Sequence, residues 1–364
     1  MLPIIQFTER PGILDIGCGH PDPALLPVEP WLAAASAAAR DYGWRSLTYG
    51  TVAGPGPLID WLSDHLETTS FFITAGASHA LALVTELLAA RGDTVLVDAP
   101  AYHFALRILR DRGVRIVAAP VDLEAFIADL RASGQRVPLL YLVPTFGNPT
   151  GLSVPDDRRR YLVDVARRTG VTLVEDDTYR ELVYTGAAPV SLWDLSGGDG
   201  SVVRIGSFSK TVAPGLRLGF VNGSPAVVRR LMDLGYVDSG GGVNHASALT
   251  MACFCASGAY ERHVTSLRSA YQARRDTLVS ALRPAFDVSP PDGGWFVWLR
   301  LPDGVTATKL LPVAEQHGVS FVPGVSFYPD GTSGDQYVRL AFSFLSAPDL
   351  TEAATRLLKA ISLR

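Results

Sequence analysis

The chain has 364 residues, which is long enough for two domains around a sizeable buried core. Its 48% hydrophobic and 19% charged residues exclude a disordered chain, and its net charge of −4 excludes the basic surface that nucleic acid requires. Three cysteines, Cys18, Cys253 and Cys255, are too few for a disulfide framework and suit a reducing cytosol.

Targeting and metal-binding signals are also missing from the sequence. No run approaches the ~20 apolar residues of a membrane-spanning helix, and residues 1–6 lack the basic start of a signal peptide. The seven histidines show no metal-ligand spacing. We therefore expect a cytoplasmic protein without a metal site that binds neither nucleic acid nor membranes.

Between residues 71 and 221, apolar runs of strand length alternate with helical segments. Strands are expected at 71–74, 94–98, 114–117, 139–143, 171–175, 202–206 and 217–221, and Ala- and Leu-rich helices at 78–91 and 156–169. This alternation predicts an α/β domain with a mainly parallel sheet, whose functional residues lie beyond the carboxyl ends of the strands.

The rest of the chain predicts a smaller α+β unit. Residues 246–282 have the pattern of one long helix that bridges to this unit. Beyond it, expected strands at 295–301 and 337–342 alternate with expected helices at 307–317 and 348–361.

The most informative motif surrounds Lys210, which ends Ser207-Phe208-Ser209-Lys210 and is followed seven residues later by Arg217. A lysine amine can form a Schiff base with an aldehyde cofactor, while hydroxyls and a guanidinium can hold its phosphate. The planar fork of Arg217 suits phosphate oxygens better than a second lysine would. The alternative is a surface lysine in a serine-rich loop.

A second motif ends the apolar run 171–175 in acids and continues through Asp176 and Asp177 to Tyr179. Such a run is typical of a buried parallel strand that delivers its carboxyl end to a site. A carboxylate there could pair with a protonated pyridine nitrogen, and Tyr179 could reach the ring's phenolic oxygen. The alternative is an acidic loop that caps a helix.

Two further patterns suit anionic ligands. Gly76, Ala77 and Ser78 stand between an expected strand and an apolar helix, where backbone N–H groups can bind phosphate, although Ser78 could equally be a plain helix cap. Arg339 lies in an apolar strand-like run, where a charge needs a partner. That partner could be a substrate carboxylate or a structural ion pair.

Together these motifs resemble the class I/II aminotransferases of fold-type I, which use pyridoxal phosphate (PLP), and are closest to the aminoadipate and kynurenine aminotransferase-like branch. Further matches lie at residues 19–23, 47–50, 74–78, 144–151, 293–296 and 338–343. The resemblance implies an α/β fold-type I PLP-dependent transferase whose large domain has a mainly parallel seven-stranded sheet flanked by helices. It also implies a homodimer.

The resemblance implies a domain division as well. Residues 41–245 would form the large PLP-binding domain, and residues 246–364 the interdomain helix and a small α+β domain. Residues 1–40 would join the small domain.

In the family, the matching residues have defined roles. Lys210 would bind PLP and move the α-proton, Asp176 would keep the ring nitrogen protonated, and Tyr179 would bind the phenolic oxygen. Further implied cofactor contacts are Gly76, Ala77, Ser78, Tyr102, Asn148, Ser207, Ser209 and Arg217, together with Tyr49, which would reach the neighbouring subunit's phosphate.

The implied substrate contacts are Gly19, Asn148 and Arg339, the last of which would bind the α-carboxylate. His20 stands where the family more often has an apolar residue, and it could be an extra acid/base group or a specificity contact. Asp177, His79 and His103 are expected to be structural or to support the residues that contact the ligands.

The implied reaction moves an amino group between an L-amino acid and a 2-oxo acid. Elimination, cyclisation or oxidation of an amino acid would use the same residues, because PLP is the electron sink for all of them. The motifs therefore leave these reactions open as alternatives.

Two readings from other classes compete with this one. Residues 13–19 resemble the glycine-rich loop of S-adenosylmethionine-dependent methyltransferases, but Pro21 replaces a glycine there, and the prolines that follow forbid a helix before about Trp31. A regulator's ligand-binding module would carry a DNA-binding head, for which no residues precede Met1. We expect a free-standing enzyme.

Overall fold

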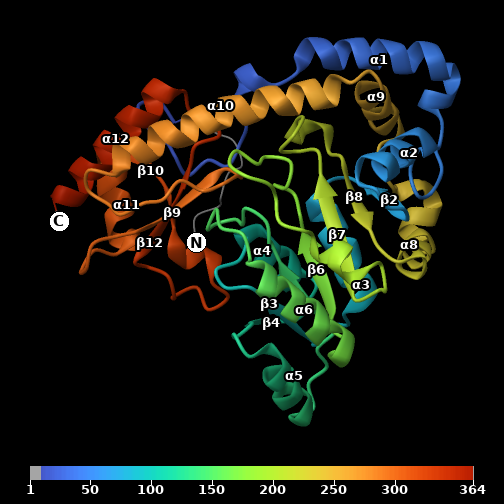
Figure 1. Cartoon of the computed structure of the whole chain (residues 1–364), viewed down its shortest axis with the longest axis horizontal. Helices are drawn as coiled ribbons and strands as arrows, with labels where there is room; N and C mark the ends of the chain where they lie inside the picture. Colours follow the sequence, from blue (N-terminus) through green and yellow to red (C-terminus); the bar gives the residue numbers. More distant parts are fainter. Residues whose placement is uncertain (1–9, 364) are drawn as a thin grey trace.

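The computed structural model describes residues 10–363, so the predictions for residues 1–6 lie outside the described residues. Two β-sheet regions lie at opposite ends of the molecule in Figure 1, and one long helix, α10 (Ala259–Leu282), runs along the side of both.

The larger sheet has seven strands in the order β2-β8-β7-β6-β5-β3-β4. Only β8 runs against its neighbours, which confirms the mainly parallel seven-stranded sheet. The strands are β2 (Phe71–Thr74), β3 (Thr94–Val97), β4 (Arg115–Ala118), β5 (Leu139–Leu142), β6 (Thr172–Asp176), β7 (Val202–Ser207) and β8 (Gly219–Asn222).

Helices cover both faces of this sheet because its inner strands are apolar on both sides. In β3, Val95 and Val97 pack in one core cluster, while Leu96 packs in another, as strand alternation requires. The first cluster includes residues of α3 (Ala77–Leu88), α4 (His103–Asp111) and α8 (Pro225–Met232). The second includes residues of α5 (Leu123–Ala132), α6 (Asp156–Thr169) and α7 (Leu192–Ser196).

The smaller region contains a three-stranded antiparallel sheet in the order β11-β12-β9 and a two-stranded parallel pair, β1-β10. A third core cluster joins these strands to the helices packed on them. The elements are β1 (Leu14–Asp15), β9 (Phe296–Arg300), α11 (Ala307–Gln316), β10 (Val319–Ser320), β11 (Val322–Pro323), η5 (Gly324–Phe327), β12 (Tyr337–Ala341) and α12 (Ala347–Ser362).

The single helix expected over residues 246–282 is wrong, because the structure has two helices there. Helix α9 (His245–Ala256) ends before Gly258, whose φ of 70° is left-handed, and α10 starts at the next residue. Glycine adopts this conformation without the steric penalty of a Cβ atom, so it ends one helix and lets the next begin at a new angle.

The N-terminal segment crosses both regions. Its first strand, β1, pairs with β10 and not with the seven-stranded sheet, which is incompatible with a methyltransferase-like nucleotide fold. Helix α1 starts at Val28, earlier than the expected Trp31, because Pro30 falls in the first turn, where its missing N–H is not needed. The remaining elements are η1 (Pro23–Leu25), α1 (Val28–Tyr42), η2 (Gly43–Leu47), α2 (Gly56–His65), η3 (Pro214–Leu216) and η4 (Val237–Gly241).

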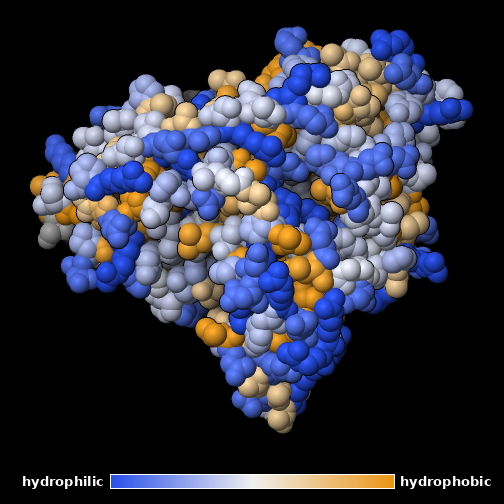
Figure 2. Space-filling view, in the orientation of Figure 1, coloured by the Kyte–Doolittle hydropathy of each residue, from blue (hydrophilic) through white to orange (hydrophobic). Residues whose placement is uncertain are grey.

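The face in Figure 2 is mostly hydrophilic, with a continuous hydrophilic band over α10 and scattered hydrophobic residues elsewhere. Within residues 10–363, every helix is too short or too polar to cross a membrane.

Candidate active site

Five strands of the large sheet, β2, β3, β5, β6 and β7, end at the same edge because they run in one direction. The segments that follow them carry most of the predicted site residues: residues 76–78 after β2, Tyr102 after β3, Asn148 after β5, Asp176 and Tyr179 at the end of β6, and residues 207–210 at the end of β7.

Lys210 lies at the centre of this edge. Its Nζ donates to the carbonyl of Gly19 at 3.4 Å and lies 4.5 Å from the ring centroid of Trp295. Burial and the nearby Arg339 lower its pKa to about 8, although Asp176 acts in the opposite direction. About a tenth of the amine is therefore neutral at pH 7, far more than for an ordinary lysine, and is available as a nucleophile or a base.

Asp176 and its neighbour Asp177 are both buried but have different partners. Asp176 accepts hydrogen bonds from the hydroxyls of Tyr141 at 2.8 Å and Thr178 at 2.5 Å. Burial raises its pKa, which these hydrogen bonds partly offset, and no arginine or lysine among residues 10–363 pairs with it. Asp177 is instead held by two arginines, at 2.8 Å each. Only Asp176 keeps a carboxylate that still needs a cation.

Tyr179 and Tyr102 lie beside Asp176. The Tyr179 ring packs edge-on against Phe296, with 5.7 Å between centroids. Burial and the neighbouring Tyr102 raise the pKa of Tyr179, while a hydrogen bond with Asn148 lowers it. Burial and Asp176 raise the pKa of Tyr102. Both hydroxyls therefore stay protonated at neutral pH and can donate hydrogen bonds.

Arg339 reaches this group from β12 and is only 4% exposed. Its Nη1 donates to Oδ1 of Asn148 at 3.0 Å, and its Nη2 donates to the carbonyl of Gly17 at 2.7 Å. The guanidinium carbon lies 4.3 Å and 5.1 Å from the ring centroids of Phe296 and Phe327. Burial lowers the pKa of Arg339 to about 10, and no carboxylate of residues 10–363 forms an ion pair with it.

The turn before α3 brings a guanidinium to a helix N-terminus. Gly76 precedes the helix with a φ of 91°, and Arg217, at a φ of 50°, donates from Nη2 to the carbonyl of Ala75 at 3.0 Å. A Cβ on Gly76 would lie 2.7 Å from that Nη2. Ala77 and Ser78 open the helix, and Ser78 is exposed. Free backbone N–H groups and Arg217 thus surround a place for an anion.

The two serines before Lys210 lie in one turn. Ser207 ends β7, and its hydroxyl accepts a hydrogen bond from the backbone N–H of Ser209 at 3.1 Å. Ser207 pairs across the sheet with Gly219, the first residue of β8, which lies two residues after Arg217. Ser207, to which Ser209 is bonded, is therefore paired with a residue close in the chain to Arg217, the arginine predicted to share the role of the two serines.

The N-terminal segment closes the site from the other side. The carbonyls of Gly17 and Gly19 accept from Arg339 and Lys210, and the carbonyl of His20 accepts from the Ser343 hydroxyl at 2.8 Å. Burial and Lys210 lower the pKa of His20, so its imidazole is neutral at pH 7. Of the two predicted substrate contacts, Gly19 thus bonds to Lys210 directly, and His20 follows it in the chain, close enough for Lys210 to affect its pKa.

Tyr49 lies apart from these residues. Its side chain is 84% exposed, and its ring lies beside Gly240, where a Cβ would meet the ring at 2.8 Å. The structure therefore leaves Tyr49 on the surface and not in this chain's own site.

The sequence did not identify three residues of the site. Tyr141 is the hydrogen-bond donor to Asp176, Trp295 is the aromatic surface under Lys210, and Phe327 is one of the two rings beside Arg339. The signal for Tyr141 was a tyrosine inside an apolar strand, since a buried hydroxyl needs a partner. Trp295 lies in the matched motif 293–296, which by itself predicts no contact with Lys210.

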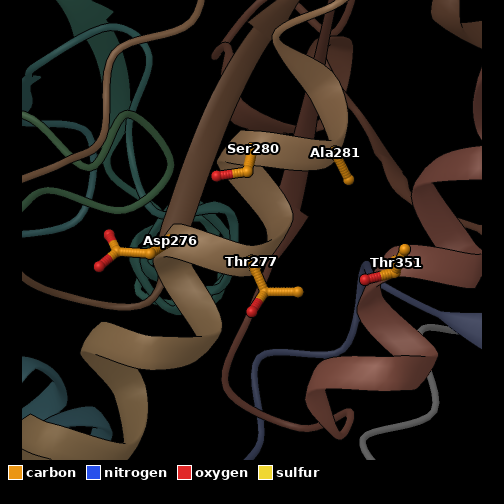
Figure 3. Close-up of a pocket in the computed structure, with 5 residues that line it drawn as sticks. All are labelled: Asp276, Thr277, Ser280, Ala281 and Thr351. Atoms are coloured by element: carbon orange, nitrogen blue, oxygen red, sulfur yellow. The ribbon is translucent and has the colours of Figure 1, made fainter.

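A groove elsewhere on the molecule involves none of these residues. A groove of about 530 Å³ lies between α10 and α12 and is lined by Asp276, Thr277, Ser280, Ala281 and Thr351, with Thr351 facing the α10 residues from α12 (Figure 3). Its lining has one carboxylate, which is already bonded to Arg275 at 2.8 Å. Within the described part of the chain, no group of His, Cys, Asp and Glu is suited to hold a metal ion.

The site has the groups that PLP requires. Lys210 offers a partly neutral amine for the aldehyde, Asp176 offers a carboxylate that lacks a cation for the ring nitrogen, and Arg217 at the start of α3 offers an anion site for the phosphate. The buried Nε of Arg339 has no hydrogen-bond partner among the described residues, which leaves a donor for a further ligand.

Comparison with known proteins gives the same result. Residues 31–357 match the model of the family "Aminotransferase class I and II". The chain is 32% identical to the 2-aminoadipate transaminase of Thermus thermophilus, over 98% of this chain and 92% of that protein. It is 28% identical to aromatic-amino-acid aminotransferase 1 of Thermococcus litoralis, over 98% and 90%.

A solved structure agrees with these relatives. The chain superposes on the kynurenine aminotransferase of Pyrococcus horikoshii, crystallised in complex with PMP, with a TM-score of 0.90 and 30% sequence identity. The match covers 97% of this chain and 91% of the Pyrococcus chain. The chain therefore belongs to the class I and II aminotransferases and is a PLP-dependent enzyme of fold-type I.

Proposed function

We propose that the residues assembled around Lys210 transfer the amino group of an α-amino acid through PLP, with Lys210 as the amine that binds the cofactor covalently. When bound, the cofactor supplies an electron sink for the charge that develops at the substrate's α-carbon. Lys210 would accept the substrate's α-proton at Nζ and would return a proton to the cofactor's aldehyde carbon. Its pKa of about 8 supports both directions, because such an amine exchanges protons readily near neutral pH.

Asp176, Tyr179 and Asn148 would hold the cofactor's ring. The unpaired carboxylate of Asp176 would bind the protonated ring nitrogen, and Tyr141 and Thr178 would keep that carboxylate in place. The protonated hydroxyl of Tyr179 and the amide of Asn148 would donate to the ring oxygen, and Tyr102 would lie against the ring. Residues 76–78, with Ser207, Ser209 and Arg217, would bind the phosphate.

Arg339 carries the assignment of the substrate class. It is a buried cation between two aromatic rings with no carboxylate partner among residues 10–363, and its pKa is lowered by burial. An α-carboxylate would supply the missing anion and two oxygens for a planar guanidinium. Gly19 and His20 would border the same substrate. An α-amino acid with a free carboxylate is therefore the proposed donor, and a 2-oxo acid the acceptor.

We also propose that the enzyme is a homodimer. Large apolar side chains are exposed along α1 and η2, which is unusual for the surface of a monomer. They are Val28 (58% exposed), Leu32 (54%), Trp44 (74%), Leu47 (85%) and Tyr49 (84%). Tyr49 sits in this group, so a partner that covers the patch would contact it, which is compatible with the role that the family resemblance implies for Tyr49 at the neighbouring subunit's phosphate.

The domain division and the cellular location belong to the same proposal. The separate sheets support a large domain at 41–245 and a smaller one at 246–364, with residues 1–40 joined to the latter through the β1-β10 pair. Cys18, Cys253 and Cys255 are all free thiols, which supports a reducing, cytoplasmic environment.

The direct test is spectroscopy of the half-reaction. The PLP-loaded protein would be mixed in turn with 2-aminoadipate, with kynurenine, with aromatic and aliphatic amino acids, and with the corresponding decarboxylated amines. We expect at least one amino acid to convert the pyridoxal absorbance to that of the pyridoxamine form, and a 2-oxo acid to restore it. Conversion by the amines at the same rate as by amino acids would contradict the role of Arg339.

A further inference from the structure

A histidine that the proposed reaction does not use lies directly beside the phosphate site. His79 is the third residue of α3, and its Nδ1 accepts a hydrogen bond from the backbone N–H of Ala75 at 3.0 Å. This bond is similar to the second half of a capping box, in which the third helical residue, usually Glu or Gln, accepts from the N–H of the N-cap residue. The N-cap of α3 is Gly76, so His79 reaches one residue further back. Here the acceptor is a histidine.

The other backbone group of Ala75 is also held. The carbonyl of Ala75 accepts from Nη2 of Arg217 at 3.0 Å, and Gly76 turns the chain into α3 at a φ of 91°. The N–H of Ala75 is therefore fixed by His79 and its carbonyl by the phosphate-binding arginine. Because Gly76 tolerates many conformations, these two bonds set the direction in which the first N–H groups of α3 point.

The hydrogen bond also fixes the protonation state of His79. Nδ1 can accept only while it carries no proton, so the single proton of the neutral ring is on Nε2. Nε2 is buried without a partner among the described residues. The Tyr236 ring faces His79, with 6.2 Å between centroids. Burial and, to a smaller extent, the cations Arg112 and Arg217 lower the pKa of His79.

We propose that His79 positions the phosphate-binding turn as an uncharged capping residue. A glutamate at this position would accept the same hydrogen bond, but its negative charge would repel the phosphate and compete with it for Arg217. A neutral acceptor preserves the turn without that competition. This inference rests on the proposed PLP site and adds a residue to it.

Four variants of the full-length protein test the inference: His79→Gln, His79→Glu, His79→Phe and, as a charge control at the end of α11, His317→Glu. After removal of bound cofactor, each is titrated with PLP and with pyridoxal, which lacks the phosphate. Thermal unfolding without cofactor reports folding separately.

We expect His79→Gln to bind PLP within about threefold of the wild type, because it keeps a neutral acceptor. His79→Glu should bind PLP at least about tenfold more weakly than His79→Gln, while their affinities for pyridoxal stay within about threefold. His79→Phe, which removes the acceptor, should lose about five- to tenfold in PLP affinity. His317→Glu should match the wild type.

Equal PLP affinity of the Glu and Gln variants would overturn the inference, as would equal losses for PLP and pyridoxal. If the Glu variant is too unstable to titrate, the comparison of the other two variants decides. A PLP affinity of His79→Gln no higher than that of His79→Phe would then overturn the inference. A wild-type protein that binds PLP no more tightly than pyridoxal would instead refute the proposed phosphate site.

Discussion

Replacing Arg339 by lysine tests the substrate assignment most sharply. The guanidinium is buried among Phe296, Phe327 and Asn148, and its pKa falls from 12.5 to about 10. At 1.36 kcal/mol per pKa unit, holding this charge without an anion costs about 3 kcal/mol. A substrate carboxylate would recover much of that energy through a charge-assisted, two-pronged contact.

Lysine keeps the charge but cannot form the planar contact. We expect Arg339→Lys to lower kcat/KM for the best amino acid by about ten- to a thousandfold, which corresponds to about 1.4–4 kcal/mol. Most of the loss should appear as a raised KM. Stopped-flow half-reactions measure this, with the PLP absorbance and the unfolding temperature as controls.

Two results would refute the reasoning. If Arg339→Lys releases PLP or unfolds at room temperature, the arginine is structural. If the variant stays folded and loses no more activity towards amino acids than towards the corresponding decarboxylated amines, Arg339 does not bind the carboxylate.

Three further predictions concern the cofactor. Asp176→Asn should retain PLP but slow α-proton exchange, followed by NMR in deuterated buffer, by several orders of magnitude. Asp177→Asn should chiefly lower the free energy of unfolding, by about 3 kcal/mol, because it removes the anion held by the buried Arg204 and the partly buried Arg180. Similar exchange rates in both variants would show that the roles are misassigned. Tyr49→Phe should weaken PLP binding about fivefold, near 1 kcal/mol, in a protein that light scattering finds dimeric, and a fully active monomer would contradict this. The rate at which PLP reacts with the cofactor-free protein should rise about tenfold from pH 6 to 7 and level off above about pH 8, because the neutral amine of Lys210 reacts and its pKa is about 8; a rise that continues to pH 10 would show an ordinary lysine.

Local patterns were sufficient to predict the large sheet. Strand β2 has the expected limits, and β6 ends at Asp176, one residue beyond the expected end. The acids that end this apolar run are buried with it, as expected of a strand that delivers its carboxyl end to a site. The parallel order of the strands then placed Lys210, Asp176 and Asn148 at one edge. Spacing alone could not place Arg339 there, since β12 belongs to a different sheet, and that expectation came from the family resemblance.

Contacts between distant segments were beyond the sequence. Nothing local shows that Tyr141 of β5 bonds to Asp176 of β6, because a strand tyrosine can face either side of its sheet. The break at Gly258 was missed because a glycine inside a long helical pattern is often tolerated. The bond from Ala75 to His79 depends on a turn geometry that the motif does not specify.

Identification of the lysine that carries PLP tests the central claim most directly. The purified PLP-loaded protein would be reduced with borohydride, digested, and its modified peptide sequenced by mass spectrometry. The account predicts a single phosphopyridoxyl group on Lys210 and none in Lys210→Ala. A modification on another lysine, or none in the wild-type protein, would contradict it.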